Sequence, residues 1–166
     1  MLDPARDRLM KPVELVARLG IVPGQTVADL GAGPGYLTSR LADAVGPNGH
    51  VIATDIDRSA LALLRDRAHG HAPIETRLVD PDDPGLSPDS VDLALLCHVD
   101  AFLPDRAGWL ERLKPALRPS GRLAVIGYSP GQAELLDAAA RAGYDSVAEA
   151  PELLPAQFFV MLRPRP

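Results

Sequence analysis

Val27-Ala-Asp-Leu-Gly-Ala-Gly-Pro-Gly-Tyr-Leu-Thr38 is the stretch from which the fold can be predicted. The apolar residues Val27 and Leu30 indicate a short buried strand, and a helical apolar pattern begins at Leu37. Between them stand three glycines at alternate positions, which allow positive φ angles and a close approach of ligand to backbone. A strand, a glycine turn and a helix N-terminus in this order form a nucleotide-sized cradle at the carboxyl end of the strand.

Outward from this stretch, strand and helix patterns alternate along the chain. Strands are expected at 27–30, 50–55, 74–79, 91–96, 123–126, 146–149 and 157–162. Helices are expected at 9–19, from about 36, at 57–68, at 105–117 and at 132–142, after a frayed lead-in at 1–8. This alternation predicts an α/β fold, with a doubly wound, Rossmann-like, seven-stranded sheet that is mostly parallel. We expect one domain over 1–166, with an N-terminal helical lead-in at 1–20 and an antiparallel C-terminal hairpin at 144–166.

The composition indicates an ordinary cytoplasmic protein. At 166 residues the chain can bury a full core, and 46% of its residues are hydrophobic. A formal net charge of -5 argues against non-specific binding to nucleic acid or to an anionic membrane. Cys97 is the only cysteine, which excludes an internal disulfide and a cysteine metal cage. The charged N-terminal segment lacks the apolar core of a signal peptide, and no apolar run reaches the roughly 18 residues of a membrane span.

The spacing of the glycines separates the nucleotides that such a turn could bind. A dinucleotide motif, G-x-G-x-x-G, would require a small residue at position 36, where this chain has Tyr36. A phosphate-binding loop is disfavoured because no Gly-Lys-Ser/Thr follows. A glycine-rich turn without a ligand remains the alternative.

The residues Asp-Leu-Gly-Ala-Gly-Pro-Gly-Tyr at 29–36 resemble the first motif of the class I S-adenosylmethionine-dependent methyltransferases. The likeness covers nearly the whole chain, because the seven strands of that family, with a final antiparallel hairpin, match the expected elements. Within the family the chain is similar to small bacterial proteins of the general methyltransferase-domain type. The resemblance implies S-adenosyl-L-methionine as cofactor, S-adenosyl-L-homocysteine as product and a small molecule as methyl acceptor.

Two carboxylates after later strands stand where the resemblance implies contacts to the adenosine part. Asp55, 20 residues past Gly35, can accept hydrogen bonds from both ribose hydroxyls, and Ile56 would pack on the adenine. The alternative is that Asp55 caps the next helix, although Asp57 suits that position better. Asp80 would face the adenine amino group or simply lie in a solvated acidic loop. The residue that follows it, Pro81, departs from the family pattern because it has no N–H to offer the ring.

The opening stretch is expected to hold the methionine part. Asp29 would lie near the cofactor's ammonium group, or else bond only local backbone N–H groups. The resemblance further implies backbone contacts from Gly31 and Ala32, and Tyr36 closing over the ligand. Gly33 and Gly35 complete the predicted cradle.

The acceptor is expected beside the end of the strand at 91–96. Methyl transfer from a sulfonium requires positioning and, for a protonated acceptor, a general base, so neither a nucleophile triad nor a metal is expected. His98 could take a proton from the acceptor or could be a hydrogen-bonded residue at the strand end that lines the pocket. Asp100 could bind a cationic acceptor or cap the next segment. Cys97 is expected to pack beside the adenine rather than to react.

Absent signatures narrow the acceptor. The Asn/Asp-Pro-Pro-Tyr signature of amino-methylating DNA, RNA and protein enzymes is missing, as are the cysteines of arsenite methyltransferases. His50, His69 and His71 do not have the spacing of a metal ligand set, and 69–71 is expected to be a solvated loop. The segment 127–131 leads almost straight into the last helix, so the pocket could be open or completed by a partner chain, for instance in a homodimer.

Three functions therefore follow from the residues in order of preference. The first is a methyltransferase acting on a small molecule. The second is an S-adenosylmethionine-binding protein without transferase activity, with a sensing or partner-binding role. The third, a nicotinamide-dependent oxidoreductase, is disfavoured by Tyr36.

Overall fold

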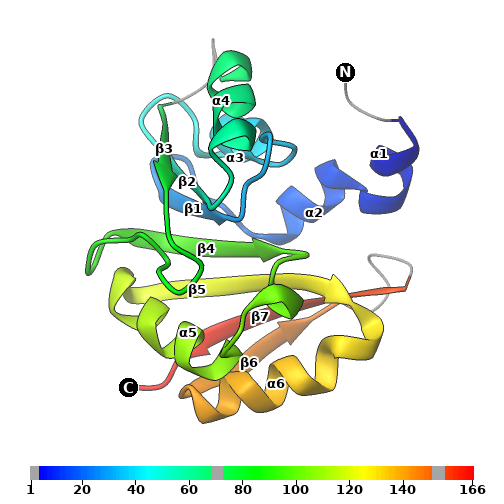
Figure 1. Ribbon diagram of the computed structural model, residues 1–166, viewed down its shortest axis with the longest axis vertical. Coiled ribbons are helices and arrows are strands. Elements are labelled where there is room, and N and C mark those ends of the chain that lie inside the picture. The colour runs from blue at the N-terminus through cyan, green and yellow to red at the C-terminus, as the bar shows by residue number, and fades with distance from the viewer. Residues whose placement is uncertain (1–3, 69–72, 151–155) are drawn as a thin grey trace.

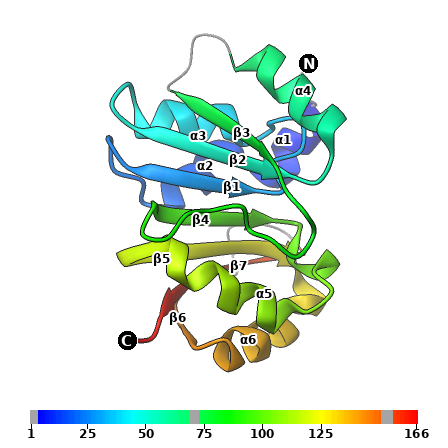
Figure 2. The same ribbon diagram turned by 60° about the vertical axis from the view of Figure 1, so that its left-hand side comes forward.

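The computed structural model describes residues 4–68, 73–150 and 156–166, with the side chains of 4–6 left aside. These residues form a seven-stranded sheet with helices on both faces (Figures 1 and 2). The strands are β1 (Thr26–Leu30), β2 (His50–Asp55), β3 (Ile74–Leu78), β4 (Val91–Cys97), β5 (Leu117–Tyr128), β6 (Tyr144–Glu149) and β7 (Gln157–Pro164). The helices are α1 (Pro4–Met10), α2 (Pro12–Arg18), α3 (Thr38–Val45), α4 (Arg58–Arg67), α5 (Arg106–Leu113) and α6 (Gln132–Arg141). Short 3-10 turns are η1 (Asp100–Phe102), η2 (Lys114–Ala116) and η3 (Ser129–Gly131).

The strand order β3-β2-β1-β4-β5-β7-β6 confirms the predicted fold class. Strands β1 to β5 pair in parallel, and β7 lies antiparallel between β5 and β6. Because β1 has β2 on one side and β4 on the other, the crossover connections diverge there to opposite faces. In an open α/β sheet, a crevice for a ligand forms at such a switch point, outside the carboxyl ends of the strands.

The two faces of the sheet have separate cores, as the period-2 alternation of a strand requires. In β1, Ala28 and Leu30 belong to the core under α5 and α6, whereas Val27 belongs to the core under α2 and α3. In β4, Leu93 and Leu95 belong to the core under α2 and α3, and their buried neighbours along the strand belong to the core under α5 and α6. A strand buried on both faces reads as the continuous apolar run seen in the sequence.

Two predicted helices have different bounds because of proline. The helix expected at 9–19 is two helices, broken at Lys11, which has φ 40°. Pro12 disfavours helical geometry at the preceding residue and starts the new helix. The expectation of a frayed segment at 1–8 is wrong from Pro4 onward, since α1 begins there, while 1–3 lie outside the described residues.

The helix expected at 105–117 ends at Leu113, because Pro115 cannot donate a helical hydrogen bond. Leu117 instead begins β5, which runs through the turn expected at 119–121. The pairing of β4 with β5 shifts register here, because Val91 pairs with Leu117 and Leu93 with Arg122, so the extra residues 118–121 of β5 form an irregularity where the turn was expected. The predicted loop at 69–71 and the link at 151–155 lie outside the described residues. That 1–166 form one domain stays a prediction.

Candidate functional site

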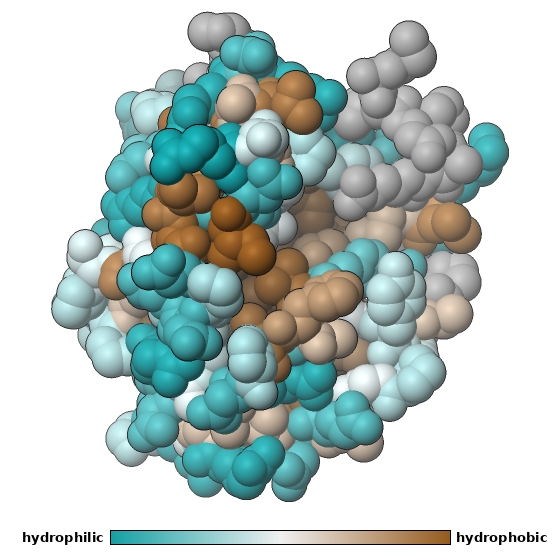
Figure 3. Space-filling model, viewed as in Figure 1, coloured by the Kyte–Doolittle hydropathy of each residue, from teal (hydrophilic) through white to brown (hydrophobic). Residues whose placement is uncertain are grey.

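A cavity of about 230 Å³ lies at the switch point of the sheet. It is enclosed by the ends of β1 to β4, by η1 with the segment after it, and by the first turn of α5. The lining residues are Leu30, Gly31, Thr54, Asp55, Ile56, Val79, Asp80, Pro81, Asp83, Leu96, Val99, Phe102, Leu103 and Trp109. Figure 3 shows apolar surface gathered around a hollow in the middle of this face of the molecule.

The glycine turn forms one edge of the cavity, and its three glycines have different reasons to be glycine. All three have positive φ, at 73° for Gly31, 55° for Gly33 and 86° for Gly35. A Cβ on Gly31 would overlap the side chain of Val99, and one on Gly35 would overlap Leu64 of α4. A Cβ on Gly33 would meet no atom within 4 Å. Gly35 therefore allows the turn to pack on α4, whereas Gly33 faces open space that a ligand could fill.

Asp55 ties the glycine turn to the end of β2. Its Oδ2 accepts the Gly33 N–H at 2.7 Å and its Oδ1 accepts the Asp57 N–H at 2.8 Å. A carboxylate has about four acceptor sites, so capacity remains for ribose hydroxyls on the cavity side. The helix-capping alternative is wrong, because Asp57 itself caps α4 by accepting the N–H groups of Ser59 and Ala60.

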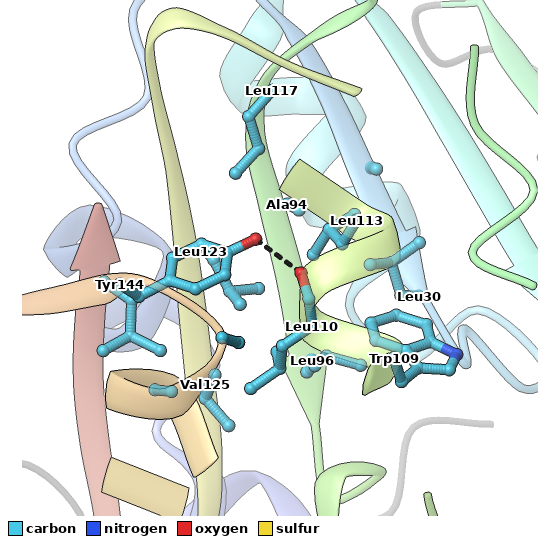
Figure 4. Packing of buried hydrophobic residues seen from close by; sticks show 14 of the residues in the cluster. Leu30, Ala94, Leu96, Trp109, Leu110, Leu113, Leu117, Leu123, Val125 and Tyr144 are labelled. Atoms are coloured by element: carbon cyan, nitrogen blue, oxygen red, sulfur yellow. Dashed lines mark hydrogen bonds between the residues drawn. The ribbon is translucent and has the colours of Figure 1, made fainter. Parts of the chain in front are cut away.

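The far part of the cavity is an apolar slot. Ile56, which is 62% exposed, lines it together with Asp80 and Pro81. Trp109, which is buried, also lines it and packs beside Leu30 and Leu96 (Figure 4). Such an apolar lining suits a flat aromatic ring such as adenine, and it includes three of the residues expected to hold that ring.

The α5 core under this slot is well anchored. Deeper along α5, the carbonyl oxygen of Leu110 accepts a hydrogen bond from the Tyr144 hydroxyl at 2.9 Å (Figure 4). Sequence reasoning missed Trp109 as a lining residue. The available signal was its position one turn after the strand-end loop, on the apolar stripe that faces the sheet.

Asp29 is buried under the turn, 3% exposed, and its Oδ2 accepts the Thr38 hydroxyl at 2.6 Å. The pKa of Asp29 is raised to about 6, mainly because burial disfavours the charged form; the hydrogen bond from Thr38 lowers the pKa and the nearby Asp55 charge raises it. The alternative of bonds to local backbone N–H groups is not what the structure shows, since the partner is a side chain. A buried carboxylate with an unfavourable charge is an acceptor that a cationic group would stabilise.

Tyr36 does not line the cavity. Its ring is buried, and its hydroxyl donates to Oδ1 of Asp7 on α1 at 2.6 Å. Arg40 donates to the Tyr36 carbonyl oxygen at 2.8 Å and lies 3.4 Å from Oδ2 of Asp7. Of the predicted cofactor residues, Gly31, Asp55, Ile56, Asp80 and Pro81 line the cavity, whereas Tyr36, Asp29, Ala32, Gly33 and Gly35 do not. Tyr36 instead joins α1 to the glycine turn.

The residues predicted at and after the end of β4 are also absent from the lining of the cavity. Asp100 is buried, and burial raises its pKa, while the Arg106 guanidinium, 3.7 Å away, lowers it. This pairing leaves Asp100 little surface to offer an acceptor. Cys97 packs against the core under α2 and α3 rather than in the wall of the slot. His98 has φ 60° and its ring stacks on Tyr128, with ring centres 4.7 Å apart.

The described part of the chain holds no group of three or more His, Cys, Asp or Glu residues that could bind a metal. Within the same ranges, each helix is too short or too polar to cross a membrane. The residues present do fit the adenosine and methionine parts of S-adenosylmethionine. The fit rests on the open space over Gly33, the unused acceptor sites of Asp55 and the buried carboxylate of Asp29.

Comparison with known proteins points the same way. A family model described as a methyltransferase domain matches residues 28–123. An uncharacterized 37.1 kDa protein in transposon Tn4556 of Streptomyces fradiae is 35% identical over 103 residues, which are 62% of this chain and 30% of that protein. The ubiquinone/menaquinone biosynthesis C-methyltransferase UbiE of Vibrio campbellii is 31% identical over 113 residues, 66% of this chain and 44% of that protein. The chain thus spans less than half the length of these curated relatives.

Solved structures share the fold over almost the whole chain. A SAM-dependent methyltransferase from Aquifex aeolicus superposes with a TM-score of 0.89 at 23% identity, covering 97% of this chain and 93% of that one. A putative methyltransferase in complex with the Trm112 methyltransferase activator of Haloferax volcanii gives a TM-score of 0.82 at 18% identity, covering 96% and 92%. At these identities the likeness concerns the fold.

Proposed function

Because the chain belongs to the class I S-adenosylmethionine-dependent methyltransferases, we propose that it transfers a methyl group from S-adenosyl-L-methionine to a small-molecule acceptor. The observation that carries this proposal is the cavity at the switch point, where Asp55, anchored by the Gly33 N–H, faces an apolar slot.

The cofactor would supply an electrophilic methyl group on a sulfonium, so the protein's work is binding and orientation. Asp55 accepts the ribose hydroxyls while Gly33 holds the carboxylate in place. Ile56 and Trp109 cover the two faces of the adenine ring. Asp29 accepts the ammonium group, whose positive charge offsets the cost of the buried carboxylate.

Two features support a small acceptor. The formal charge of -5 gives nucleic acid no electrostatic attraction. UbiE, whose name assigns it to quinone biosynthesis, is a C-methyltransferase among the relatives. His98, which precedes the cavity residue Val99 in the chain, is the residue that we propose faces such an acceptor.

A second candidate is an S-adenosylmethionine-binding protein without transferase activity, which has a sensing or partner-binding role. It is favoured by the direct passage from β5 through the three-residue η3 into α6, which adds no cover over the acceptor side. A putative methyltransferase of the same fold is solved in complex with a methyltransferase activator, so this fold can bind a partner chain.

Calorimetry with S-adenosylmethionine and with S-adenosylhomocysteine tests what both candidates share. Absence of binding by either compound would refute both. Release of S-adenosylhomocysteine with members of a panel of phenols, quinone precursors and amines supports the transferase. Tight binding with no turnover on any of them, alone or with cell extract, would favour the second candidate.

A further inference from the structure

Gln157 is an unexpected residue at the start of β7. It is 9% exposed, and the five residues that follow it, 158–162, are apolar and buried. A buried amide costs free energy unless its polar atoms find partners. The side-chain partner of Gln157 in the described residues is His98.

The sheet brings these two side chains together. Gln157 pairs with Tyr128 in the antiparallel ladder of β5 and β7, and the Tyr128 ring stacks on the His98 ring with 8° between their planes. The His98 N–H donates to the carbonyl oxygen of Ile126 at 2.8 Å. His98 also holds a positive φ, which is strained for a residue other than glycine. The imidazole is therefore held by the backbone of His98, by the Tyr128 ring stacked on its face and by the hydrogen bond at one of its nitrogens.

The hydrogen bond to Gln157 decides which nitrogen of a neutral ring carries the proton. Nε2 of His98 lies 2.7 Å from Oε1 of Gln157. A carbonyl oxygen only accepts, so Nε2 must donate, and the neutral ring then has its lone pair on Nδ1. No hydrogen-bond partner for Nδ1 occurs among the residues that the structure describes.

We propose that Gln157 is a positioning residue, which holds His98 through Nε2–H so that Nδ1 takes the proton that the methyl acceptor loses. The inference rests on the proposed function and specifies its acceptor, which carries a proton on the reacting atom, as a hydroxyl group does. As the acceptor oxygen bonds the methyl carbon, the carbon–sulfur bond breaks and its electron pair stays on sulfur. The proton of the hydroxyl passes to Nδ1, and the imidazolium later returns it to water.

Two matched variants distinguish a positioning role of Gln157 from a role in filling space. Gln157→Met keeps the length of the side chain and removes the carbonyl acceptor, whereas Gln157→Glu keeps an acceptor oxygen. In protein labelled with ¹⁵N-histidine, at a pH where the ring is neutral, we expect a resolved Nε2–H signal for His98. The His98→Gln variant identifies that signal among the four histidines. The signal should be lost to exchange with water in Gln157→Met and kept in Gln157→Glu.

The spectra need no acceptor, so they are independent of the proposed function. A wild-type His98 that carries its proton on Nδ1 overturns the inference, as does an Nε2–H signal that survives in Gln157→Met. Calorimetry with S-adenosylmethionine on the same samples is the fold control, and unchanged affinity is expected. Loss of that affinity in Gln157→Met alone would mean a structural role and also overturn the inference. If the wild-type protein does not bind S-adenosylmethionine, the proposed function is refuted instead.

Once an acceptor is found, the kinetics give a second test. Gln157→Met should lower kcat about 10- to 100-fold, the size expected when a catalytic group is slightly misplaced. The KM for S-adenosylmethionine should stay unchanged, and Gln157→Glu should restore most of the rate. Equal rates for all three proteins would contradict the positioning role.

Discussion

Asp55 and Asp57 are two residues apart, yet their carboxylates serve different purposes. Asp57 uses its side chain within α4, where it caps two backbone N–H groups. Asp55 lines the cavity and bonds the glycine turn. The pair therefore allows a comparison in which charge and location along the chain are nearly constant and only the direction of the side chain differs.

We expect Asp55→Ala to weaken S-adenosylmethionine binding by about 1–3 kcal/mol, the range for lost bonds to a charged group. Asp57→Ala should leave binding unchanged and lower the free energy of unfolding by about 1 kcal/mol through loss of the cap. Calorimetry and urea unfolding of both variants provide the measurements. Unchanged affinity in Asp55→Ala would show that the ribose is held elsewhere.

Asp29 predicts a dependence of stability on pH. Its pKa is raised from 3.8 to about 6 by burial. A carboxyl with a higher pKa in the folded state stabilises the fold fully below pH 3.8, and this contribution is lost as the pH rises through about 6. A pKa raised from 3.8 to about 6 corresponds to about 3 kcal/mol of stability.

We therefore expect Asp29→Asn, which keeps an oxygen for the Thr38 hydroxyl, to be more stable than the wild type near pH 7 and about equal near pH 3. Urea unfolding at both pH values measures the difference. The same variant should bind S-adenosylmethionine more weakly, because the ammonium loses its counter-charge. A variant that is less stable than the wild type near pH 7 would refute the assigned cost of burial.

Residues whose position follows from the end of a strand could be placed from the sequence, and those whose contacts depend on distant pairing could not. Asp55 comes directly after β2, so the parallel order alone puts it at the switch point. Gln157 meets His98 only because β7 inserts between β5 and β6, a register that no local pattern encodes. The family resemblance predicts that Tyr36 closes over the ligand, but in the structure its hydroxyl bonds Asp7 on α1.

Among the elements, α1 is held by few contacts that can be tested singly. The hydroxyl of Tyr36 and the guanidinium of Arg40 both approach the Asp7 carboxylate. Helices of seven residues are marginal without packing. The docking of α1 beside the glycine turn therefore depends on these side chains together with Met10, which is buried in the core under α2 and α3.

Tyr36→Phe should release α1 without disturbing the core. Loss of one hydrogen bond costs about 1 kcal/mol, which raises the undocked fraction about fivefold. Trypsin cleavage after Arg8, within α1, should accelerate by a similar factor under conditions where opening precedes cleavage. Tyr128→Phe, which removes an exposed hydroxyl, is the matched control and should change nothing. Equal cleavage rates in both variants would show that Asp7 does not hold α1.

The types of the elements could be predicted because the period and the length of each apolar pattern agreed with its burial. The exact ends of some elements could not. The six residues of β2 have the bounds that the sequence predicts. The ends of two helices were mispredicted at Pro12 and Pro115. A proline can stand in the first turn of a helix or at a break between helices, and the sequence alone does not show which of the two the packing selects.

For the whole molecule, alternation of elements sufficed to predict the sheet, since parallel strands joined by helices have few allowed arrangements. The cavity could not be drawn from that pattern, because its second wall comes from α5 and η1, which fold back over the switch point. Trp109 in that wall is the only tryptophan of the chain, so it reports on the site alone.

Binding of S-adenosylmethionine should change the emission of Trp109, because the adenine would stack near a ring that is now beside an open slot. The same ligand should stabilise the whole fold, by about 2.7 kcal/mol at a free concentration 100 times its Kd. The Kd from emission and the Kd from the shift in unfolding should agree, whereas NAD should give neither response. Trp109→Phe, which keeps an aromatic wall, should lose the signal and still show the stabilisation. If the ligand stabilises the wild type and leaves its emission unchanged, the adenine does not lie against Trp109, and the slot has another occupant.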